Sequence, residues 1–237
     1  MTESAMTFMN HLVELRGRLI KTVIAVGVTT VVAFFFYQDV LDVLATPYLK
    51  AVDGDQLAFF QPTEAFSLAL RVSLWTGVVL ASPVVIYHLW RFVGPALTAR
   101  ERRYVIPLSG VLALLFLGGI VAGYLALPLT LSLLVSFGGD LLEPTIGADF
   151  YLRFAMRFLL AFGIAFEFPV FLFAAALTGL TTSEKLKSWR RYAITVIVIA
   201  AALLTPGGDP LTLLLLSGPL YVLYELTIIA IRLILKK

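Results

Sequence analysis

Long apolar segments, separated by short polar ones, run along the whole chain of 237 residues. A bilayer core of about 30 Å requires about 20 apolar residues in a helix, and six segments reach or approach this length. They predict membrane-spanning helices at about 19–37, 66–90, 107–129, 153–179, 192–205 and 210–232. We therefore expect an all-α polytopic membrane protein in which residues 1–237 form a single transmembrane domain.

The fifth apolar segment, 192–205, is shorter than the others. Its roughly 14 residues make about 21 Å of helix, and the turn Pro-Gly-Gly-Asp at 206–209 follows at once. We expect helices five and six to form a tight hairpin. A span this short also predicts local thinning of the bilayer or a recessed surface beside it.

Composition supports a location in the membrane. Hydrophobic residues make up 60% of the chain and charged residues 14%, whereas a soluble domain has about 45–50% and about 25%. The amino terminus begins with an acidic, polar stretch, and its first apolar run leads into further spans. We therefore expect the first helix to remain as a membrane anchor rather than to be removed as a signal peptide.

The basic residues predict the orientation of the six spans. Of the 18 basic residues, the 14 named next fall on one side of the membrane, and the opposite side carries mainly acids. These basic residues are Arg16, Arg18, Lys21, Arg91, Arg100, Arg102, Arg103, Lys185, Lys187, Arg190, Arg191, Arg232, Lys236 and Lys237. By the positive-inside rule, both termini are expected in the cytoplasm.

Two long segments are expected on the outer side, at about 38–65 and 130–152. They contain Pro47, Pro62 and Pro144 and are rich in Phe, Tyr and Leu. We expect these segments to form a structured cap at the membrane interface.

Several kinds of chemistry are excluded by the residues that the chain lacks. It has no cysteine and only two histidines, His11 and His88, which excludes disulfides, thiol catalysis and metal sites built on either residue type. A Walker phosphate loop, Gly-x-Ser-x-Gly and His-Glu-x-x-His are also absent. We expect no catalysis, no cofactor and no metal. Membrane topology accounts for the basic residues, so no nucleic-acid partner is expected.

Three acidic residues remain as candidates for function. Glu14 lies four residues before Arg18, so the two can pair across one helical turn. Glu101 is flanked by basic residues in the sequence Ala-Arg-Glu-Arg-Arg and can form a solvated surface salt bridge. Glu167 lies in the middle of an apolar span, where a charge costs about 2.5–3.5 kcal/mol on insertion scales.

Glu167 has two readings on the sequence alone. It is either a buried carboxyl bonded to a neighbouring helix or a functional group, the usual reason for an acid inside the membrane. Pro169 follows two residues later and frees a backbone carbonyl one turn before it, which predicts a bend in the helix. A proton-coupled secondary transporter would use Glu167 as its carrier. Such transporters have repeated halves with matching interrupted helices, and only the fourth span here has a central acid. Glu225, near the end of the last span, is expected to snorkel to the interface or to pair locally.

Five separated motifs occur in the order found in one family. They are HLVELRGRLI, ATPYL, SPVVIYHLWRFVGPALTARERRYV, AFGIAFEFPV and LLTPGGDP. In these motifs the chain resembles TatC, the multispanning receptor family of the twin-arginine protein translocase, over nearly its whole length.

The resemblance implies six transmembrane helices in a concave, glove-like arrangement with both termini in the cytoplasm. It also implies a receptor in the cytoplasmic membrane of a prokaryote that binds signal peptides with two consecutive arginines. Such receptors contact lipid, form homo-oligomers within the complex and assemble with the single-span proteins TatA and TatB. The complex exports folded proteins and uses the proton-motive force.

The resemblance assigns the reading of the arginine pair to cytoplasmic residues. Glu14 and Glu101 match the acids that bind the two arginines. Arg16, Arg18 and Phe92 match other functionally sensitive positions of the same face.

The resemblance also assigns roles to residues inside the membrane and at its outer side. Glu167 matches the polar residue of the fourth helix that faces the concavity. Pro47 and Asp209 match positions in the outer cap and the last outer turn, and Thr205 matches a polar position beside which a partner helix docks. The chain departs from the family in this turn, which is one residue longer before the aspartate, and in the start of helix six, where Thr212 is the only polar side chain.

Overall fold

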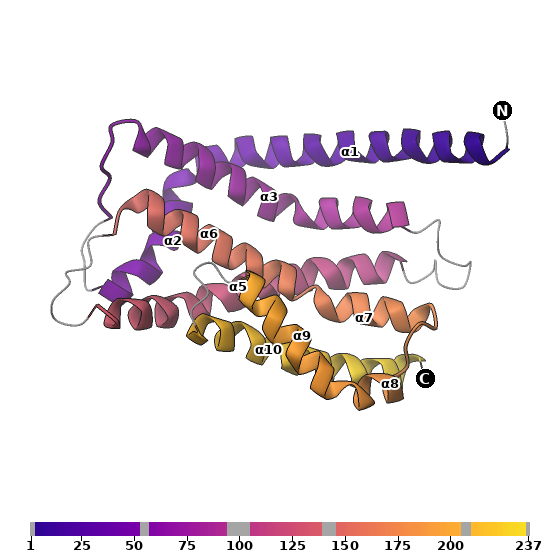
Figure 1. Cartoon of the computed structure of the whole chain (residues 1–237). Helices are drawn as coiled ribbons and strands as arrows, with labels where there is room; N and C mark the ends of the chain where they lie inside the picture. The colour runs from indigo at the N-terminus through magenta and orange to yellow at the C-terminus, as the bar shows by residue number, and fades with distance from the viewer. Residues whose placement is uncertain (1–2, 53–56, 94–104, 139–145, 205–209, 236–237) are drawn as a thin grey trace. The chain divides into compact units, whose positions relative to one another are not determined.

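The computed structural model describes residues 3–52, 57–93, 105–138, 146–204 and 210–235, and these residues are helical almost throughout (Figure 1). The helices are α1 (Glu3–Phe35), α2 (Tyr37–Val52), α3 (Glu64–Val93), α5 (Val105–Ser136), α6 (Ala148–Ala165), α7 (Phe168–Leu177), α8 (Ser183–Ser188), α9 (Arg190–Leu204) and α10 (Pro210–Ala230), followed by the π-helical turn η3 (Ile231–Leu235). The predicted all-α fold is confirmed for this part of the chain.

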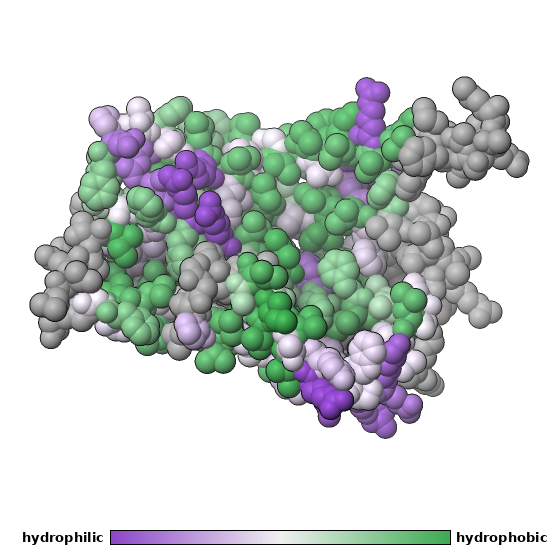
Figure 2. All heavy atoms as spheres, in the orientation of Figure 1, coloured by the Kyte–Doolittle hydropathy of each residue, from purple (hydrophilic) through white to green (hydrophobic). Residues whose placement is uncertain are grey.

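Within the described ranges, five helical segments are long and apolar enough to cross a membrane. They are Leu12–Phe35, Glu64–Phe92, Pro107–Ser136, Ala148–Leu177 and Thr212–Leu235. The remaining predicted span, 192–205, corresponds to α9. Its 15 residues make about 22 Å of helix, so this helix is short, as the sequence predicts. Apolar side chains cover most of the face shown in Figure 2, which is the surface expected of a protein solvated by lipid.

The chain folds as two compact units, residues 1–37 with 69–113 and residues 38–68 with 114–237. In the first unit, α1 and α3 approach closely at Gly77. The Thr29 hydroxyl donates a hydrogen bond to the Gly77 carbonyl at 2.8 Å, and a Cβ at position 77 would lie 2.7 Å from the Thr30 Cα. Glycine at this position therefore permits the helix crossing.

In the second unit, α6 is the central element. Its buried residues recur at helical spacing, for example Leu152, Ala155, Leu159 and Phe162, so the helix is covered on a broad face. Helix α5 packs closely against α6 at Gly119. A Cβ added at this position would lie 2.6 Å from the Phe162 carbonyl oxygen.

The segment at 38–65 contains α2, which lies against α5 and α6 within the second unit. The Tyr151 hydroxyl donates to the Leu44 carbonyl at 2.6 Å, and the Tyr124 hydroxyl donates to the Val43 carbonyl at 2.9 Å. Tyr48 is buried and its ring centroid lies 5.0 Å from that of Tyr151. The prediction that the segment at 38–65 is structured is confirmed for its described residues.

Glu64 joins the segment at 38–65 to the start of α6 within the second unit. One carboxylate oxygen accepts hydrogen bonds from the backbone N–H groups of Phe60 at 2.8 Å and Gln61 at 3.3 Å. The other accepts from the N–H of Asp149 at 3.1 Å. The Ala148 N–H also donates to the Ala58 carbonyl at 2.7 Å. The sequence analysis did not single out Glu64, because its long-range partner is a backbone group and leaves no side-chain pattern.

Candidate functional site

Glu14 lies on α1 and forms the predicted ion pair with Arg18 one turn later. The Arg18 Nε donates to Glu14 Oε1 at 3.0 Å, and a terminal nitrogen of the same guanidinium binds the same oxygen. The Glu14 side chain remains 37% exposed. Arg18 therefore orients the carboxylate on the helix surface without covering it.

Of the other residues predicted to bind the arginine pair, the structure describes Arg16, Arg18 and Phe92 but not Glu101. Arg16 is exposed on α1 and Phe92 is half-buried near the end of α3, in the same unit as Glu14. Glu101 lies outside the described residues, so the predicted proximity of the two acids stays a prediction.

Glu167 lies at an interruption of the helix, where Pro169 predicts a bend. Helix α6 ends at Ala165 and α7 begins at Phe168, so Phe166 and Glu167 form a turn between them. The Glu167 N–H donates to the carbonyl of Ile164, three residues back, at 3.1 Å. Pro169 has no N–H to donate, which removes a bond that would continue the α-helix across this point.

The Glu167 side chain is buried, with only 9% of the residue exposed. Neither of its carboxylate oxygens has a hydrogen-bond partner among the described residues. The reading in which a neighbouring helix supplies that bond thus finds no donor in the described part of the chain. Leaving a buried polar group without a partner costs about 1–3 kcal/mol, so Glu167 does not stabilise the described part of the chain.

A second polar cluster joins α9 to α10 in the second unit. Arg190 donates to one oxygen of Glu225 at 2.7 Å, and the Tyr221 hydroxyl donates to the other at 3.1 Å. The hydrogen bond to Glu225 raises the pKa of Arg190 above its ordinary value. Glu225 therefore pairs locally with Tyr221, as one reading predicted, and also across helices. The sequence analysis missed the second partner because Arg190 lies 35 residues away.

The remaining predicted positions concern the cap and the last hairpin. Pro47 is buried within α2, consistent with a structural role in the segment at 38–65. Thr205 and Asp209 lie outside the described residues. Thr212 is buried at the start of α10.

A family model described as "Sec-independent protein translocase protein (TatC)" matches residues 10–219 of the chain. The chain belongs to the TatC family. The match includes the α1 segment with Glu14 and the α6–α7 interruption with Glu167, so both candidate positions lie within the family region. The resemblance inferred from the separated motifs is confirmed.

Two proteins named "Sec-independent protein translocase protein TatC" illustrate the similarity. The protein of Desulforapulum autotrophicum is 40% identical, over 99% of this chain and 87% of its own length. The protein of Carboxydothermus hydrogenoformans is 36% identical, over 100% of this chain and 97% of its own length. Because nearly the whole of both proteins is matched, the similarity is not confined to one motif.

A solved structure shares the fold. The crystal structure titled "Twin Arginine Translocase Receptor- TatC in DDM" is 38% identical to this chain, with a TM-score of 0.79, over 94% of this chain and 100% of that one. This TatC-family chain is accordingly a component of the twin-arginine protein transport system. It shares the helical fold of the receptor subunit.

Proposed function

We propose that this chain is the receptor that binds twin-arginine signal peptides on the cytoplasmic side of a prokaryotic inner membrane. Both of its termini lie in the cytoplasm. It assembles with TatA- and TatB-type single-span proteins, and with further copies of itself, to export folded proteins with the proton-motive force. The observation that carries this proposal is an exposed carboxylate, Glu14, oriented by Arg18 within the region that matches the TatC family.

The chemistry of the arginine pair suits carboxylate acceptors. A guanidinium is planar, permanently charged and presents a rigid fork of donors, and a carboxylate accepts two parallel hydrogen bonds from it. Two adjacent arginines require two such acceptors, for which we propose Glu14 and Glu101. Arg16, Arg18 and Phe92 complete the binding face.

The ion pair of Glu14 with Arg18 predicts modest affinity for the arginine motif. An incoming arginine competes with Arg18 for Glu14 Oε1, and an exposed ion pair is worth only about 0–1 kcal/mol. The apolar core of the signal peptide therefore supplies much of the binding free energy, and the arginine pair supplies specificity.

A crosslinking experiment tests this assignment. A peptide with an Arg-Arg motif and a photoreactive group is added to membranes that contain the protein, and the yield is compared for Glu14→Gln, Glu101→Gln and a peptide with Lys-Lys. Each change is expected to reduce the yield several-fold. Glu184→Gln is the matched control, because Glu184 is an exposed acid on α8. Equal yields for all variants and both peptides would contradict the proposal.

Glu167 has a separate proposed role as a docking point for a polar group of a partner helix inside the membrane. Its two unpartnered oxygens and the helix interruption beside it support this role. Glu167→Ala is expected to leave arginine-motif crosslinking within about twofold of the parent, and to reduce crosslinking of a TatA- or TatB-type partner. Loss of motif recognition instead would contradict the separation of the two sites.

A further inference from the structure

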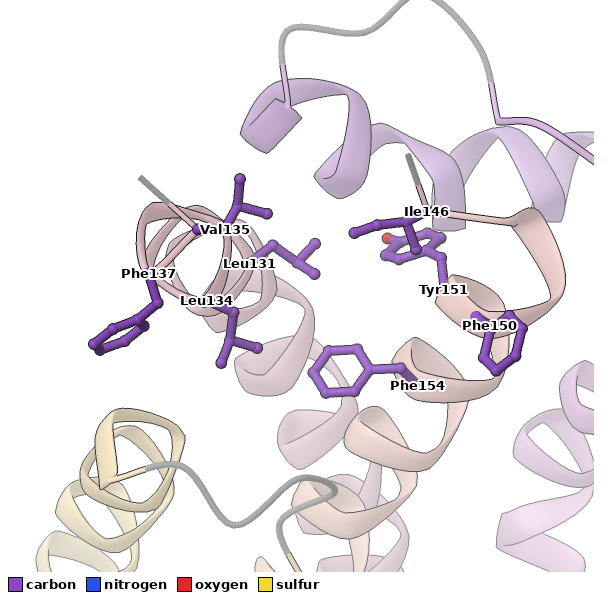
Figure 3. A pocket seen from close by; sticks show the side chains of 9 residues that line it. Leu131, Leu134, Val135, Phe137, Ile146, Phe150, Tyr151 and Phe154 are labelled. Carbon is purple, nitrogen blue, oxygen red and sulfur yellow. The ribbon is translucent and has the colours of Figure 1, made fainter. Parts of the chain in front are cut away.

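An apolar groove lies between the end of α5 and the start of α6 in the second unit (Figure 3). Its volume is about 510 Å³. The α5 side is formed by Leu131, Leu134 and Phe137, and the opposite side by Ile146, Phe150 and Phe154. Leu131, Leu134 and Phe154 face the space between the two helices in Figure 3. None of the functions proposed above uses this groove.

Two arginines border the groove on α6. Arg153 and Arg157 are four residues apart and both are exposed. Residues three, four and seven apart share a helix face, so the arginines share the face of Phe150 and Phe154. The groove is thus apolar, with a basic edge formed by its own helix.

The basic edge carries an excess positive charge. Arg153 forms an ion pair with Asp149, whereas no ion pair or hydrogen bond links the Arg157 side chain to another described residue. Asp149 balances Arg153, and Glu64 lies against the start of the same helix, so the excess positive charge is that of Arg157, farther along α6. An anion that contacts both arginines would balance this excess.

An anion beside Arg157 would stabilise this charge, because Arg157 lies within a candidate membrane span. Arg157 lies nine residues after Ala148 and within the span Ala148–Leu177, about 14 Å along the helix. An exposed guanidinium at this depth is costly. Helical side chains tilt toward the N-terminus, so Arg157 extends toward Arg153 and the start of α6, where a headgroup can reach it.

We propose that this groove and its two arginines form a binding site for one anionic phospholipid. An acyl chain fills the space between α5 and α6, and the phosphate contacts Arg153 and Arg157. The positive edge selects an anionic headgroup rather than a zwitterionic one.

Native mass spectrometry of the full chain, purified in detergent, tests the site with two lipids of equal chain length. Phosphatidylglycerol is expected to be retained several-fold more than phosphatidylcholine. The double variant Arg153→Gln/Arg157→Gln is expected to lose that preference, and Arg191→Gln, which changes an exposed arginine of α9, is expected to keep it. Leu134→Trp fills the groove and is expected to reduce retention of both lipids.

A second measurement keeps the test decisive if a variant does not fold. The preference of the unaltered chain for phosphatidylglycerol is expected to fall as ionic strength rises, because salt screens the headgroup contact. Equal retention of both lipids at low salt would overturn the proposal. So would displacement of phosphatidylglycerol by millimolar inorganic phosphate, which would show a site for the free anion, or crosslinking of Phe154 to a partner helix in place of lipid.

Discussion

At the scale of one residue, Glu167 is a buried polar group that opposes stability. The buried carboxylate oxygens have no partner among the described residues, which costs about 1–3 kcal/mol. Glu167→Leu is therefore expected to raise the melting temperature of the isolated chain in detergent, while export of a folded reporter in cells falls. The exposed change Glu184→Gln should leave both measurements unchanged. A lower melting temperature for Glu167→Leu would mean that the carboxyl is bonded in the native chain.

The hydroxyl of Tyr151 offers a second prediction at this scale. It donates to the Leu44 carbonyl from a fully buried position, so Tyr151→Phe removes a hydrogen bond and leaves a buried acceptor unpaired. We expect a loss of about 1–3 kcal/mol in the free energy of unfolding. Tyr124→Phe is the matched control, because its bond to Val43 is exposed and water can replace the hydroxyl. Equal melting temperatures for the two variants would contradict this role of Tyr151.

At the scale of elements, the contact between α5 and α6 depends on small residues. Gly119→Ala places a Cβ 2.6 Å from the Phe162 carbonyl oxygen, whereas a Cβ at the adjacent Gly118 meets nothing within 4 Å. Overpacking of this kind costs about 1–3 kcal/mol. A clear fall in melting temperature is expected for Gly119→Ala, and Gly118→Ala should match the parent. If both variants melt with the parent, the two helices do not pack at Gly119.

The place of the interruption between α6 and α7 could be predicted from the sequence, as a bend, because its cause is local. Pro169 removes a backbone donor wherever the chain folds, so the effect follows from one residue. The shortness of α9 was equally readable, since length in a membrane follows from the count of apolar residues. Local periodicity therefore predicted the helices well.

Contacts between distant residues could not be predicted in the same way. The pairing of Glu225 with Arg190 and the acceptance of the Asp149 N–H by Glu64 depend on which segments the fold brings together. The α5–α6 groove could not be predicted from the sequence either, because it depends on how the two helices lie in the fold. The Glu14–Arg18 pair was predicted because its members lie one helical turn apart.

At the scale of the whole molecule, specificity and binding free energy are expected to come from different parts of the receptor. The carboxylates distinguish arginine from lysine, and apolar surface holds the rest of the signal peptide. Shortening the apolar core of the peptide by four leucines is expected to weaken binding more than Arg-Arg→Lys-Lys does, because burying each leucine contributes about 1.5–3 kcal/mol. Titration of fluorescent peptides into protein in nanodiscs measures both effects, and a larger loss from Lys-Lys would reverse this division.

The central claim is that Glu14 contacts an arginine of the signal peptide, and a double-mutant cycle tests it most directly. Dissociation constants are measured for Arg-Arg and Lys-Lys peptides with the parent chain and with Glu14→Gln in nanodiscs. If Glu14 reads one of the two arginines, the change to Lys-Lys weakens binding to the parent several-fold and weakens binding to Glu14→Gln less, because only the proposed Glu101 contact is then left to lose, so the two changes are coupled. Additive effects, with Lys-Lys equally harmful to both proteins, would contradict the claim.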